Sequence, residues 1–469
     1  MTSLLRLATA LDSLWSSPVC VTLNTNTGVV PLKKLKPNGL KVLVVGGGGR
    51  EHALVWKLRQ SPRVSEVYCA PGNAGIEKIA KCVNIKADDV TGLLTFAWEK
   101  RIDLTVVGPE APLSAGIVDV FNDHEMPIFG PTQKAAEIEG SKAFSKDLMQ
   151  KYGIPTASYG VFTEVEPALA FVDELAARKT IAGSPCVVKA DGLAAGKGVI
   201  VAKDVTEAKE AVRSMLEGNA FGSAGSRVVI EEFMEGEEVS ILAFTDGDHV
   251  IPMVSAQDHK RIFDNDEGPN TGGMGAYSPA PVYTEELAQQ VQESILKPTV
   301  EAMKAEGRPY SGVLYAGLMI TAEGPKVLEY NARFGDPETQ PVLMRLDTDL
   351  VDIIEAILEK RLDQQAISWS TDAAVCVVMS AKGYPGDYEK GNFITGLDNP
   401  IAGVEVFHAG TAQKGDHVVT TGGRVLGVTA KAQGIREAIE LAYRQVGNVC
   451  FDGAHYRKDI GRRALERLS

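Results

Sequence analysis

A segment at residues 328–340, with the letters LEYNARFGDPETQ, carries side chains suited to holding a metal ion and an anion. Successive side chains of a β-strand point to opposite faces, so we expect Glu329, Asn331 and Arg333 to share one face. A carboxylate and an amide oxygen are hard ligands that suit Mg²⁺ bound to nucleotide phosphates. An arginine on the same face suits an anionic substrate or a phosphoryl group in transfer. The alternative is a half-buried strand with a surface salt bridge.

A glycine-rich segment at residues 189–199, KADGLAAGKGV, is the second candidate. Backbone N–H groups of such a loop can surround phosphate oxygens, and a lysine adds a compact positive charge. It is not a Walker A loop, because only three residues separate Gly192 from Gly196 and Gly198 replaces the metal-binding Ser or Thr. We predict a flap that closes over a nucleotide, with a solvated hairpin as the alternative. The lysines and glycines of this flap are Lys189, Gly192, Gly196, Lys197 and Gly198.

The third candidate is a charged cluster, Asp258, His259, Lys260 and Arg261, that precedes a stretch rich in Gly and Pro at 268–281. That stretch shows no helical or strand periodicity. A loop of this length inside a folded domain is usually a binding loop, so we expect 268–281 to be a functional loop without regular structure.

A glycine turn, Gly46–Gly49, follows an apolar β-branched run at 41–45 and precedes a segment with helical spacing. The N-terminus of a helix offers backbone donors and a favourable dipole to a phosphate. The next predicted strand, ending near Ala70, has no acid after it to hold the ribose of a dinucleotide. The turn therefore favours a sugar monophosphate over NAD.

The elements that must position these residues alternate along the chain. Short apolar strands at 41–45, 66–70 and 103–108 are separated by helical segments and end in loops, which predicts a doubly wound, Rossmann-like sheet. A single helix is predicted over 136–155, ended by Gly153 and Pro155. Further helices are predicted at 350–358 and near 435–446, the latter after several short strands.

The composition limits the classes of protein to which the chain can belong. It has 469 residues, of which 44% are hydrophobic and 23% charged, as in globular proteins of several domains. The formal net charge of −13 argues against non-specific binding to nucleic acid or an anionic membrane. Because no apolar run reaches about 18 residues, we expect no membrane span. Six scattered cysteines without a CxxC pair are typical of free thiols in a reducing compartment.

Residues 1–38 differ from the rest of the chain. They are rich in Ser and Thr, and their charged residues are Asp12, Arg6, Lys33, Lys34 and Lys36. A Ser-rich leader poor in acids is typical of an organellar transit peptide, and the alternative is a disordered tail. As a transit peptide it would direct the protein to the plastid (chloroplast) or the mitochondrion; otherwise we expect a cytoplasmic protein.

Taken together and in this order, the motifs resemble the phosphoribosylamine–glycine ligase family (glycinamide ribonucleotide synthetases) of the ATP-grasp superfamily. The resemblance covers about residues 41–466, and GPNTGGMGAYSP followed at this distance by RFGDPETQP is its most specific part. It implies an α/β protein with an ATP-grasp fold, a doubly wound N-terminal domain and a C-terminal α+β domain. The domains expected are a leader at 1–38, a phosphoribosylamine-binding domain at 39–140, an ATP-grasp domain at 141–364 with its flap lobe at about 160–235, and a C-terminal domain at 365–469.

The resemblance also implies roles for particular residues. ATP would be bound by Lys142, Lys189, the flap, Glu231, Glu232, Phe233 and Glu238, and Mg²⁺ or Mn²⁺ by Glu329 and Asn331. Phosphoribosylamine and glycine would be bound by Gly48, Gly49, Arg50, Asp258, Lys260, Gly273, Gly275 and Arg333. The residues expected to act in catalysis are Arg333, Lys189 and Asp336.

The activity implied is ATP-dependent ligation of glycine to 5-phosphoribosylamine through glycyl phosphate, in purine biosynthesis. The partners expected are the small-molecule substrates glycine, 5-phosphoribosylamine and ATP, with no nucleic acid or membrane, and we expect a monomer or weak dimer. Three alternatives stay open: another ATP-grasp ligase, a non-catalytic ATP-binding regulator, and a nicotinamide oxidoreductase suggested by the glycine turn alone.

Overall fold

The N-terminal sheet forms from β-branched runs that are buried on both faces, as parallel strands covered by helices are. The computed structural model describes residues 34–178, 186–192, 198–217, 226–398 and 401–468. Within them, five parallel strands lie in the order β3-β2-β1-β4-β5. These strands are β1 (Leu40–Gly46), β2 (Val64–Pro71), β3 (Lys81–Cys82), β4 (Leu104–Val107) and β5 (Ile128–Phe129). The helices between and after them are α1 (Gly49–Leu58), α2 (Val90–Lys100), α3 (Glu110–Ser114), α4 (Ile117–Asp123) and α5 (Gln133–Gly140), with a 3₁₀ turn at Ile76–Lys78.

The single helix predicted over 136–155 is wrong, because the chain breaks at Ser141. Ser141 has extended backbone angles (φ −133°, ψ 113°), and its hydroxyl accepts a hydrogen bond from the Phe144 N–H at 3.1 Å. It therefore ends α5 and caps the start of α6 (Lys142–Tyr152). The predicted stop at Gly153 is confirmed, because Gly153 takes a left-handed conformation (φ 68°).

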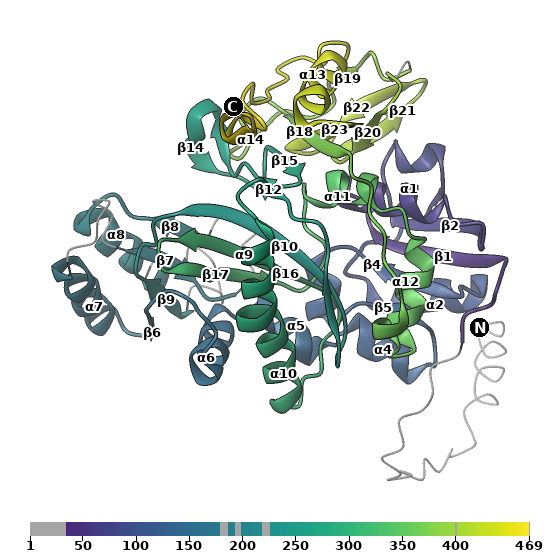
Figure 1. The fold of residues 1–469 in the computed structure, drawn as a ribbon. Helices are drawn as coiled ribbons and strands as arrows, with labels where there is room; N and C mark the ends of the chain where they lie inside the picture. The colour runs from purple at the N-terminus through teal and green to yellow at the C-terminus, as the bar shows by residue number, and fades with distance from the viewer. Residues whose placement is uncertain (1–33, 179–185, 193–197, 218–225, 399–400, 469) are drawn as a thin grey trace, which may run out of the picture. The chain divides into compact units, whose positions relative to one another are not determined.

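The central part of the chain contains two antiparallel sheets (Figure 1). The smaller has the order β6-β9-β7-β8, with β6 (Tyr159–Phe162), β7 (Val187–Ala190), β8 (Val199–Val201) and β9 (Val228–Glu231). Two helices, α7 (Val165–Ala177) and α8 (Val205–Leu216), cover it with apolar residues at helical spacing, among them Ala168, Leu169, Val172 and Leu175. In Figure 1 this lobe lies at the left.

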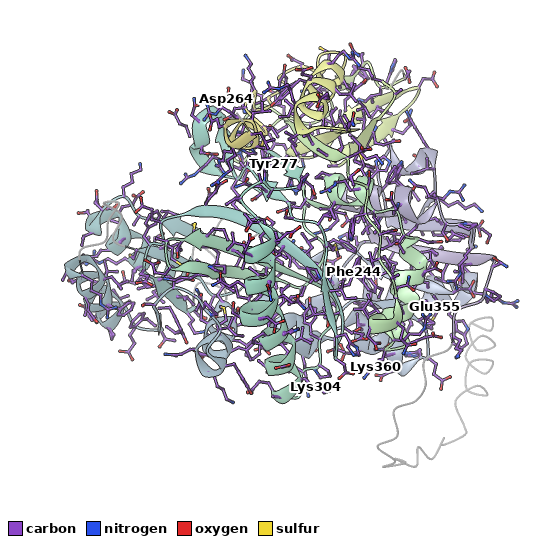
Figure 2. The ribbon with its side chains drawn as sticks, in the orientation of Figure 1. Phe244, Asp264, Tyr277, Lys304, Glu355 and Lys360 are labelled. Atoms are coloured by element: carbon purple, nitrogen blue, oxygen red, sulfur yellow. The ribbon has the colours of Figure 1, made fainter. Side chains whose placement is uncertain are left out.

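The larger central sheet has the order β11-β10-β16-β17, with β10 (Glu237–Asp246), β11 (Val250–Pro252), β16 (Ser311–Thr321) and β17 (Gly324–Asn331). The helices in this part of the chain are α9 (Glu285–Val291), α10 (Lys297–Ala305), α11 (Thr339–Arg345) and α12 (Leu350–Leu358), with a π turn at Gln292–Leu296 and a 3₁₀ turn at Leu362–Gln364. Phe244 of β10, labelled in Figure 2, is fully buried in the core that this sheet shares with the N-terminal strands. Glu355 of α12 pairs with Arg63 at 2.9 Å and ties the two parts together.

A third sheet, in the order β12-β15-β18-β23-β20, forms the C-terminal part with α13 (Ile435–Val446) and α14 (Arg462–Leu468). Its strands are β12 (Gln257–Asp258), β15 (Gly275–Ser278), β18 (Ala373–Ser380), β20 (Val404–His408) and β23 (Arg424–Ala432). Beside it stand β19 (Phe393–Ile394), β21 (Thr411–Lys414) and β22 (His417–Thr420). Strands β12 and β15 lie before residue 364, so sheet pairing crosses the boundary predicted between the central and C-terminal domains.

The expectation that 268–281 has no regular structure is wrong. It contains the end of a hairpin, β13 (Arg261–Phe263) with β14 (Glu267–Asn270), and all of β15, which pairs with β18. These strands are too short to show an alternating pattern, and the partner of β15 lies about a hundred residues further along the chain. No helix in the described parts of the chain is long and apolar enough to cross a bilayer.

Candidate nucleotide and substrate site

Strand β17 presents Glu329 and Asn331 on one face, while Tyr330 between them is buried on the other. A register shift against β16 interrupts the alternation just before Glu329. Arg333 lies two residues beyond the end of the strand, yet its Nη2 donates to Asn331 Oδ1 at 3.0 Å. The three side chains expected to act together are thus adjacent.

Arg333 is held by two carboxylates from the N-terminal part of the chain. Its Nη2 lies 3.0 Å from Glu139 Oε1, and its Nε lies 3.5 Å from Glu110 Oε2. Glu139 also accepts the Ala332 N–H at 2.6 Å, which fixes the backbone after the strand. Burial raises the pKa of Glu139, and the positive charge of Arg333 offsets only part of that rise.

Three lysines approach this strand, and a buried carboxylate orders two of them. Glu231 Oε1 lies 2.8 Å from Lys189 Nζ, and its Oε2 lies 2.9 Å from Lys146 Nζ. Lys189 Nζ also donates to the carbonyl of Leu328 at 3.2 Å, beside the metal-ligand candidate Glu329. Lys142 Nζ donates to the Gly192 carbonyl at 2.8 Å, at the base of the flap.

Lys146 is a site residue that sequence reasoning missed. It is buried, and this lowers its pKa to about 8 even though Glu231 favours the charged form. The signal was present, because Lys142 and Lys146 are four residues apart on α6 and so share a helix face.

The carboxylate of Glu329 stands among positive charges without a direct partner. Burial raises its pKa, but Lys260, Lys189, Lys142 and Arg333 together outweigh burial and keep the pKa below its usual range. Among the described residues, none makes a hydrogen bond or ion pair with this carboxylate. An ionised, unpaired carboxylate beside an amide oxygen is a ligand set that suits a divalent cation.

The flap is only partly described. The Ala190 N–H donates to the Gly198 carbonyl at 2.8 Å and closes its base, where Gly192 has φ 118°. Gly196 and Lys197 lie outside the described residues.

The residues expected around adenine make different contacts in the structure. Glu231 directs its carboxylate to the lysines, and Glu232 Oε1 accepts the Ser158 N–H at 2.9 Å. Phe233 is half-buried beside them, and Glu238 pairs with Lys260 at 2.6 Å. An apolar cluster suited to a flat base lies close by and consists of Ala157, Met234, Met319 and Leu328.

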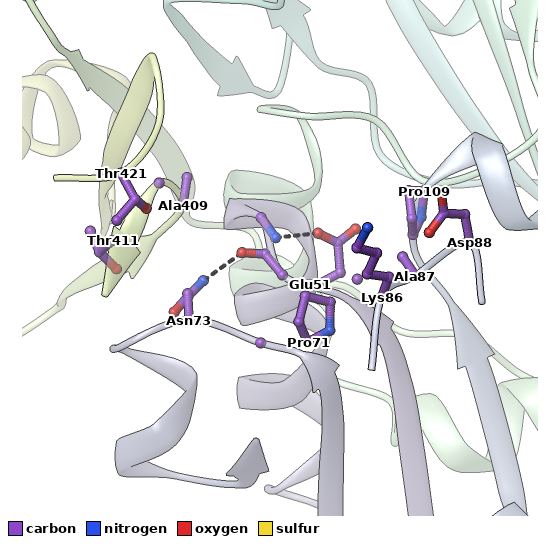
Figure 3. A pocket seen from close by; sticks show the side chains of 15 residues that line it. Glu51, Pro71, Asn73, Lys86, Ala87, Asp88, Pro109, Ala409, Thr411 and Thr421 are labelled. Atoms are coloured by element: carbon purple, nitrogen blue, oxygen red, sulfur yellow. Dashed lines mark hydrogen bonds between the residues drawn. The ribbon is translucent and has the colours of Figure 1, made fainter. Parts of the chain in front are cut away.

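The glycine turn borders a pocket of about 500 Å³ between the N-terminal strands and the C-terminal sheet (Figure 3). A side chain at Gly47 would lie 2.5 Å from the Gly72 carbonyl oxygen, so only glycine fits there. Gly48 donates its N–H to Glu51 at 2.5 Å, and Gly49 begins α1. Sequence reasoning missed the rest of the pocket wall, which includes Asn73, Lys86, Asp88, Thr411 and Thr421. These residues lie far apart in the chain, so no local motif indicates them.

Arg50 links this turn to the end of β17. Its Nε donates to Glu51 at 2.6 Å and its Nη1 donates to the Phe334 carbonyl at 3.1 Å. Asp336 follows in the same loop and pairs with Arg424 of β23 at 3.0 Å. Arg424 also donates to the Gly272 carbonyl at 2.6 Å. This chain of contacts brings together parts of the N-terminal sheet, the larger central sheet and the C-terminal sheet.

Asp258 and Lys260 lie near this group of contacts, close enough to Glu329 for the charges to interact. Burial and the negative charges of Glu338, Glu238 and Glu329 raise the pKa of Asp258 to about 7, although Lys260 acts in the opposite sense. The pKa of Lys260 lies above its usual range, because Glu238 and Asp258 outweigh the effect of burial. Gly273 has φ 111°, and a Cβ there would lie 2.4 Å from Pro337, while Gly275 is the first residue of β15.

Three family models match consecutive parts of the chain. The phosphoribosylglycinamide synthetase N domain matches residues 40–139, the ATP-grasp (A) domain matches 140–339, and the C domain matches 374–463. A phosphoribosylamine–glycine ligase of Vibrio vulnificus (strain YJ016) is 55% identical over 432 residues, which are 91% of this chain and 99% of that protein. One of Escherichia coli (strain K12) is 55% identical over 433 residues, with the same coverage.

Solved structures show the same architecture. A phosphoribosylamine–glycine ligase from Thermotoga maritima aligns with a TM-score of 0.77 and 32% identity, covering 90% of this chain and 100% of that chain. A biotin carboxylase domain of 2-oxoglutarate carboxylase from Hydrogenobacter thermophilus aligns with a TM-score of 0.69 at 18% identity over 90% and 92%, which indicates the fold alone. The α/β class and the ATP-grasp fold with a doubly wound N-terminal part are confirmed.

Proposed function

Because this chain belongs to the phosphoribosylglycinamide synthetase family, we propose that it is a phosphoribosylamine–glycine ligase. It joins glycine to 5-phosphoribosylamine with cleavage of ATP to ADP and phosphate, in purine biosynthesis. The observation that carries the proposal is the position of the Glu329 carboxylate, which has no hydrogen-bond or ion-pair partner among the described residues, beside the lysines of α6 and β7 at one end of β17.

The metal site fits a divalent cation held jointly by protein and nucleotide. Glu329 and Asn331 supply two oxygens, and no group of three or more His, Cys, Asp or Glu residues suited to a metal occurs in the described residues. Mg²⁺ and Mn²⁺ accept such a set when phosphate oxygens and water complete it. When bound, the ion would neutralise charge on the phosphates of ATP.

ATP would lie between the two central sheets. We infer that adenine packs on the apolar cluster of Met234, Met319, Leu328 and Ala157, which offers an apolar surface to a flat ring. Lys142 and Lys189 would bind the phosphates, and Glu231 would hold the ammonium of Lys189 in place. The flap of 192–198 would cover the phosphates and exclude water.

The first chemical step activates the glycine carboxylate. A carboxylate oxygen attacks the γ-phosphorus of ATP, a new O–P bond forms, and the bond to the β-phosphate oxygen breaks to release ADP. Glycyl phosphate results. Lys189 and Arg333 stabilise the charge that spreads over the phosphoryl oxygens, and Asp336, beside Gly273, would orient the glycine amino group.

The second step forms the amide. The phosphoribosylamine nitrogen attacks the carbonyl carbon of glycyl phosphate, the C–O bond to phosphate breaks, and the nitrogen loses a proton. Asp258 and Lys260 border the space where this amine would lie. The glycine turn, with Gly48, Gly49 and Arg50, would hold the sugar phosphate through backbone donors and a cation.

The test of the proposed function is ADP release by the purified chain with ATP, Mg²⁺, glycine and phosphoribosylamine generated in situ. Omitting one component at a time should abolish ADP release, and glycinamide ribonucleotide should accumulate only with all four. ADP release that is indifferent to glycine would refute the ligase assignment and leave the fold unaffected. The same assay with Mn²⁺ in place of Mg²⁺ defines the metal preference.

We also propose that residues 1–38 are a transit peptide for the plastid, with the mitochondrion as a second destination. Their composition supports this, since they are rich in Ser and Thr and poor in acids. A fusion of residues 1–38 to a fluorescent protein should enter plastids of plant cells. Fluorescence that stays in the cytoplasm would contradict the proposal.

We propose a monomer or weak dimer, which light scattering of the purified chain would test.

A further inference from the structure

The C-terminal segment, which none of the proposed chemical steps uses, contains a completely buried arginine. Arg457 makes a bidentate ion pair with Asp459, in which Nε donates to Oδ1 and Nη2 donates to Oδ2, both at 2.8 Å. Its Nη1 reaches out to the β13–β14 hairpin, where it lies 2.8 Å from Asp266 Oδ1 and 3.1 Å from the Arg261 carbonyl. A buried guanidinium in which all three nitrogen atoms donate hydrogen bonds is expected to fix geometry.

Other contacts fasten the same hairpin to the same segment. His455 Nε2 donates to the Ile262 carbonyl at 2.9 Å, the Lys458 N–H donates to Asp264 at 2.7 Å, and the Asn265 N–H donates to Asp459 at 2.9 Å. Figure 2 labels Asp264 beside the C-terminal helix. We call the contacts between residues 261–270 and 455–463 the clasp.

The clasp also stabilises the turn of the hairpin. Asn265 and Asp266 have φ values of 60° and 57°, a left-handed conformation that is uncommon outside glycine and that Asn and Asp adopt more readily than other residues. Contacts from the surrounding chain help to hold two successive residues in this conformation. Asp266 makes a second ion pair, with Arg463, so both of its carboxylate oxygens are engaged by the C-terminal segment.

Both ends of the hairpin lead directly into the substrate side of the site. The Thr271 N–H donates to the Lys260 carbonyl at 2.8 Å, and the Met274 N–H donates to the His259 carbonyl at 2.8 Å. The buried ring of His259 accepts the Gly461 N–H at 3.2 Å, which adds a contact to the C-terminal segment between Asp258 and Lys260. A shift of the hairpin would therefore move those two side chains and the loop of 271–275 together.

We propose that Arg457 is a positioning residue for the ligase site, which acts through Asp266 and the hairpin to hold Asp258, Lys260 and the loop of 271–275 toward phosphoribosylamine and glycine. This inference rests on the proposed function. Among the described residues, the lysines that would bind the phosphates of ATP lie on α6 and β7 and make no hydrogen bond or ion pair with the clasp. Lys260 does pair with Glu238, one of the residues that would contact the nucleotide. The clasp should consequently affect the two other substrates more strongly than the nucleotide.

The variant that tests this is Asp266→Asn in the full chain. It weakens the link to the hairpin but keeps the buried pair of Arg457 with Asp459, whereas removal of Arg457 would strand two carboxylates and risk misfolding. The KM values for phosphoribosylamine and glycine should each rise about tenfold, as expected for a small loss of substrate alignment. The KM for ATP and the Kd for ADP should change by less than about twofold. Asp266→Glu keeps the charge and should recover most of the loss.

The matched control is Lys458→Ala, because the Lys458 side chain is exposed and its backbone N–H, which the substitution keeps, makes the clasp contact. It should behave as the unsubstituted protein. Hydrogen–deuterium exchange of 258–275 should be faster in Asp266→Asn than in either the control or the unsubstituted chain. If Asp266→Asn lowers only the melting temperature, with KM values and exchange unchanged, the clasp has no positioning role.

Hydrogen–deuterium exchange also tests the positioning role of the clasp independently of the proposed function. If the unsubstituted chain does not ligate glycine to phosphoribosylamine, the proposed function fails on its own. Faster exchange at 258–275 in Asp266→Asn would then still support the clasp, and unchanged exchange would overturn it.

Discussion

Glu329 is the carboxylate that the surrounding charges keep ionised and ready for a cation. Glu329→Ala removes a proposed metal ligand and leaves four positive groups facing one another, so we expect ADP formation to fall by about a thousandfold or more. Asn331→Asp, which replaces one oxygen ligand by another, should still bind metal. ADP formation measured under saturating ATP and Mg²⁺ checks both variants.

The matched control for this pair is Glu323→Ala. Glu323 lies in the turn between β16 and β17, on the same hairpin, with an exposed side chain. Its loss should leave ADP formation within about twofold, since exposed ion pairs contribute little. Activity of Glu329→Ala equal to that of the control would refute the ligand assignment.

Lys146 illustrates how a buried residue can matter without reaching the substrate. In Lys146→Met, Glu231 loses one of its two ammonium partners and draws Lys189 closer, away from the phosphates. We expect the KM for ATP to rise about tenfold, equivalent to about 1.4 kcal/mol. Steady-state kinetics with ATP varied measures this change. Lys151→Met, an exposed lysine on the same helix, is the control, and an equal effect of both variants would contradict the role of Lys146.

At the scale of elements, α1 and β20 meet through two buried histidines. The His408 N–H donates to His52 Nδ1 at 2.8 Å, and the two rings lie 5.7 Å apart. Burial, with smaller effects of His408 and Lys78, lowers the pKa of His52 to about 3, and burial with a smaller effect of Lys78 lowers that of His408 to about 4. Both rings are therefore neutral in the folded protein and would become charged in the unfolded chain below about pH 6.5.

The sign of the pH effect follows from these values. Between about pH 6.5 and pH 4 the unfolded chain binds more protons than the folded one, so stability falls as the pH falls. Each histidine contributes up to about 1.4 kcal/mol per pH unit in that range. We expect His52→Gln to lose less stability than the unsubstituted chain between pH 7 and pH 5, measured by thermal unfolding. His124→Gln, at an exposed site, should match the unsubstituted chain, and identical profiles for all three proteins would contradict the prediction.

The sequence predicts elements well where the apolar repeat and the end signals agree. Helices α12 and α13 have the predicted bounds, because apolar residues recur at helical spacing and Asp349 or Gly434 precedes the first turn. The break at Ser141 was missed, since one hydroxyl that caps α6 outweighs an otherwise continuous helical pattern. Strand β15 was missed because its pairing with β18 is a long-range contact.

The same difference between local patterns and long-range contacts holds for the site. The grouping of Glu329, Asn331 and Arg333 was predictable because they lie within five residues of one another. Glu329 and Asn331 share a strand face as expected, whereas Arg333 lies beyond the end of the strand and reaches Asn331 from there. The carboxylates that hold Arg333, and the threonines that complete the pocket at the glycine turn, come from distant parts of the chain. Local sequence patterns carry no information about such contacts; they arise only when the sheets pack.

At the scale of the whole molecule, the site needs all three matched parts of the chain. Arg50 reaches the Phe334 carbonyl, Arg333 reaches Glu139, and Asp336 reaches Arg424. These contacts join residues from 40–139, 140–339 and 374–463, the three ranges that the family models match. Residues before 40 lie outside the three family-model matches, and 91% of the chain already aligns with 99% of the Vibrio vulnificus relative.

We therefore expect deletion of residues 1–33 to leave kcat within about twofold and the melting temperature within about 2 °C of the full chain. Deletion of residues 1–38 should cost more, because Lys36 pairs with Asp103 at 2.7 Å, its carbonyl accepts from Arg63 at 3.1 Å, and Leu35 packs on the core. Losing these contacts should lower the stability by about 1–2 kcal/mol, seen as a drop of a few degrees by calorimetry. The two truncations differ by only five residues and serve as controls for each other. A large loss of kcat in the chain that lacks residues 1–33 would mean that the leader takes part in the working enzyme. Equal melting temperatures of the two truncated chains would mean that residues 34–38 do not anchor the first strand.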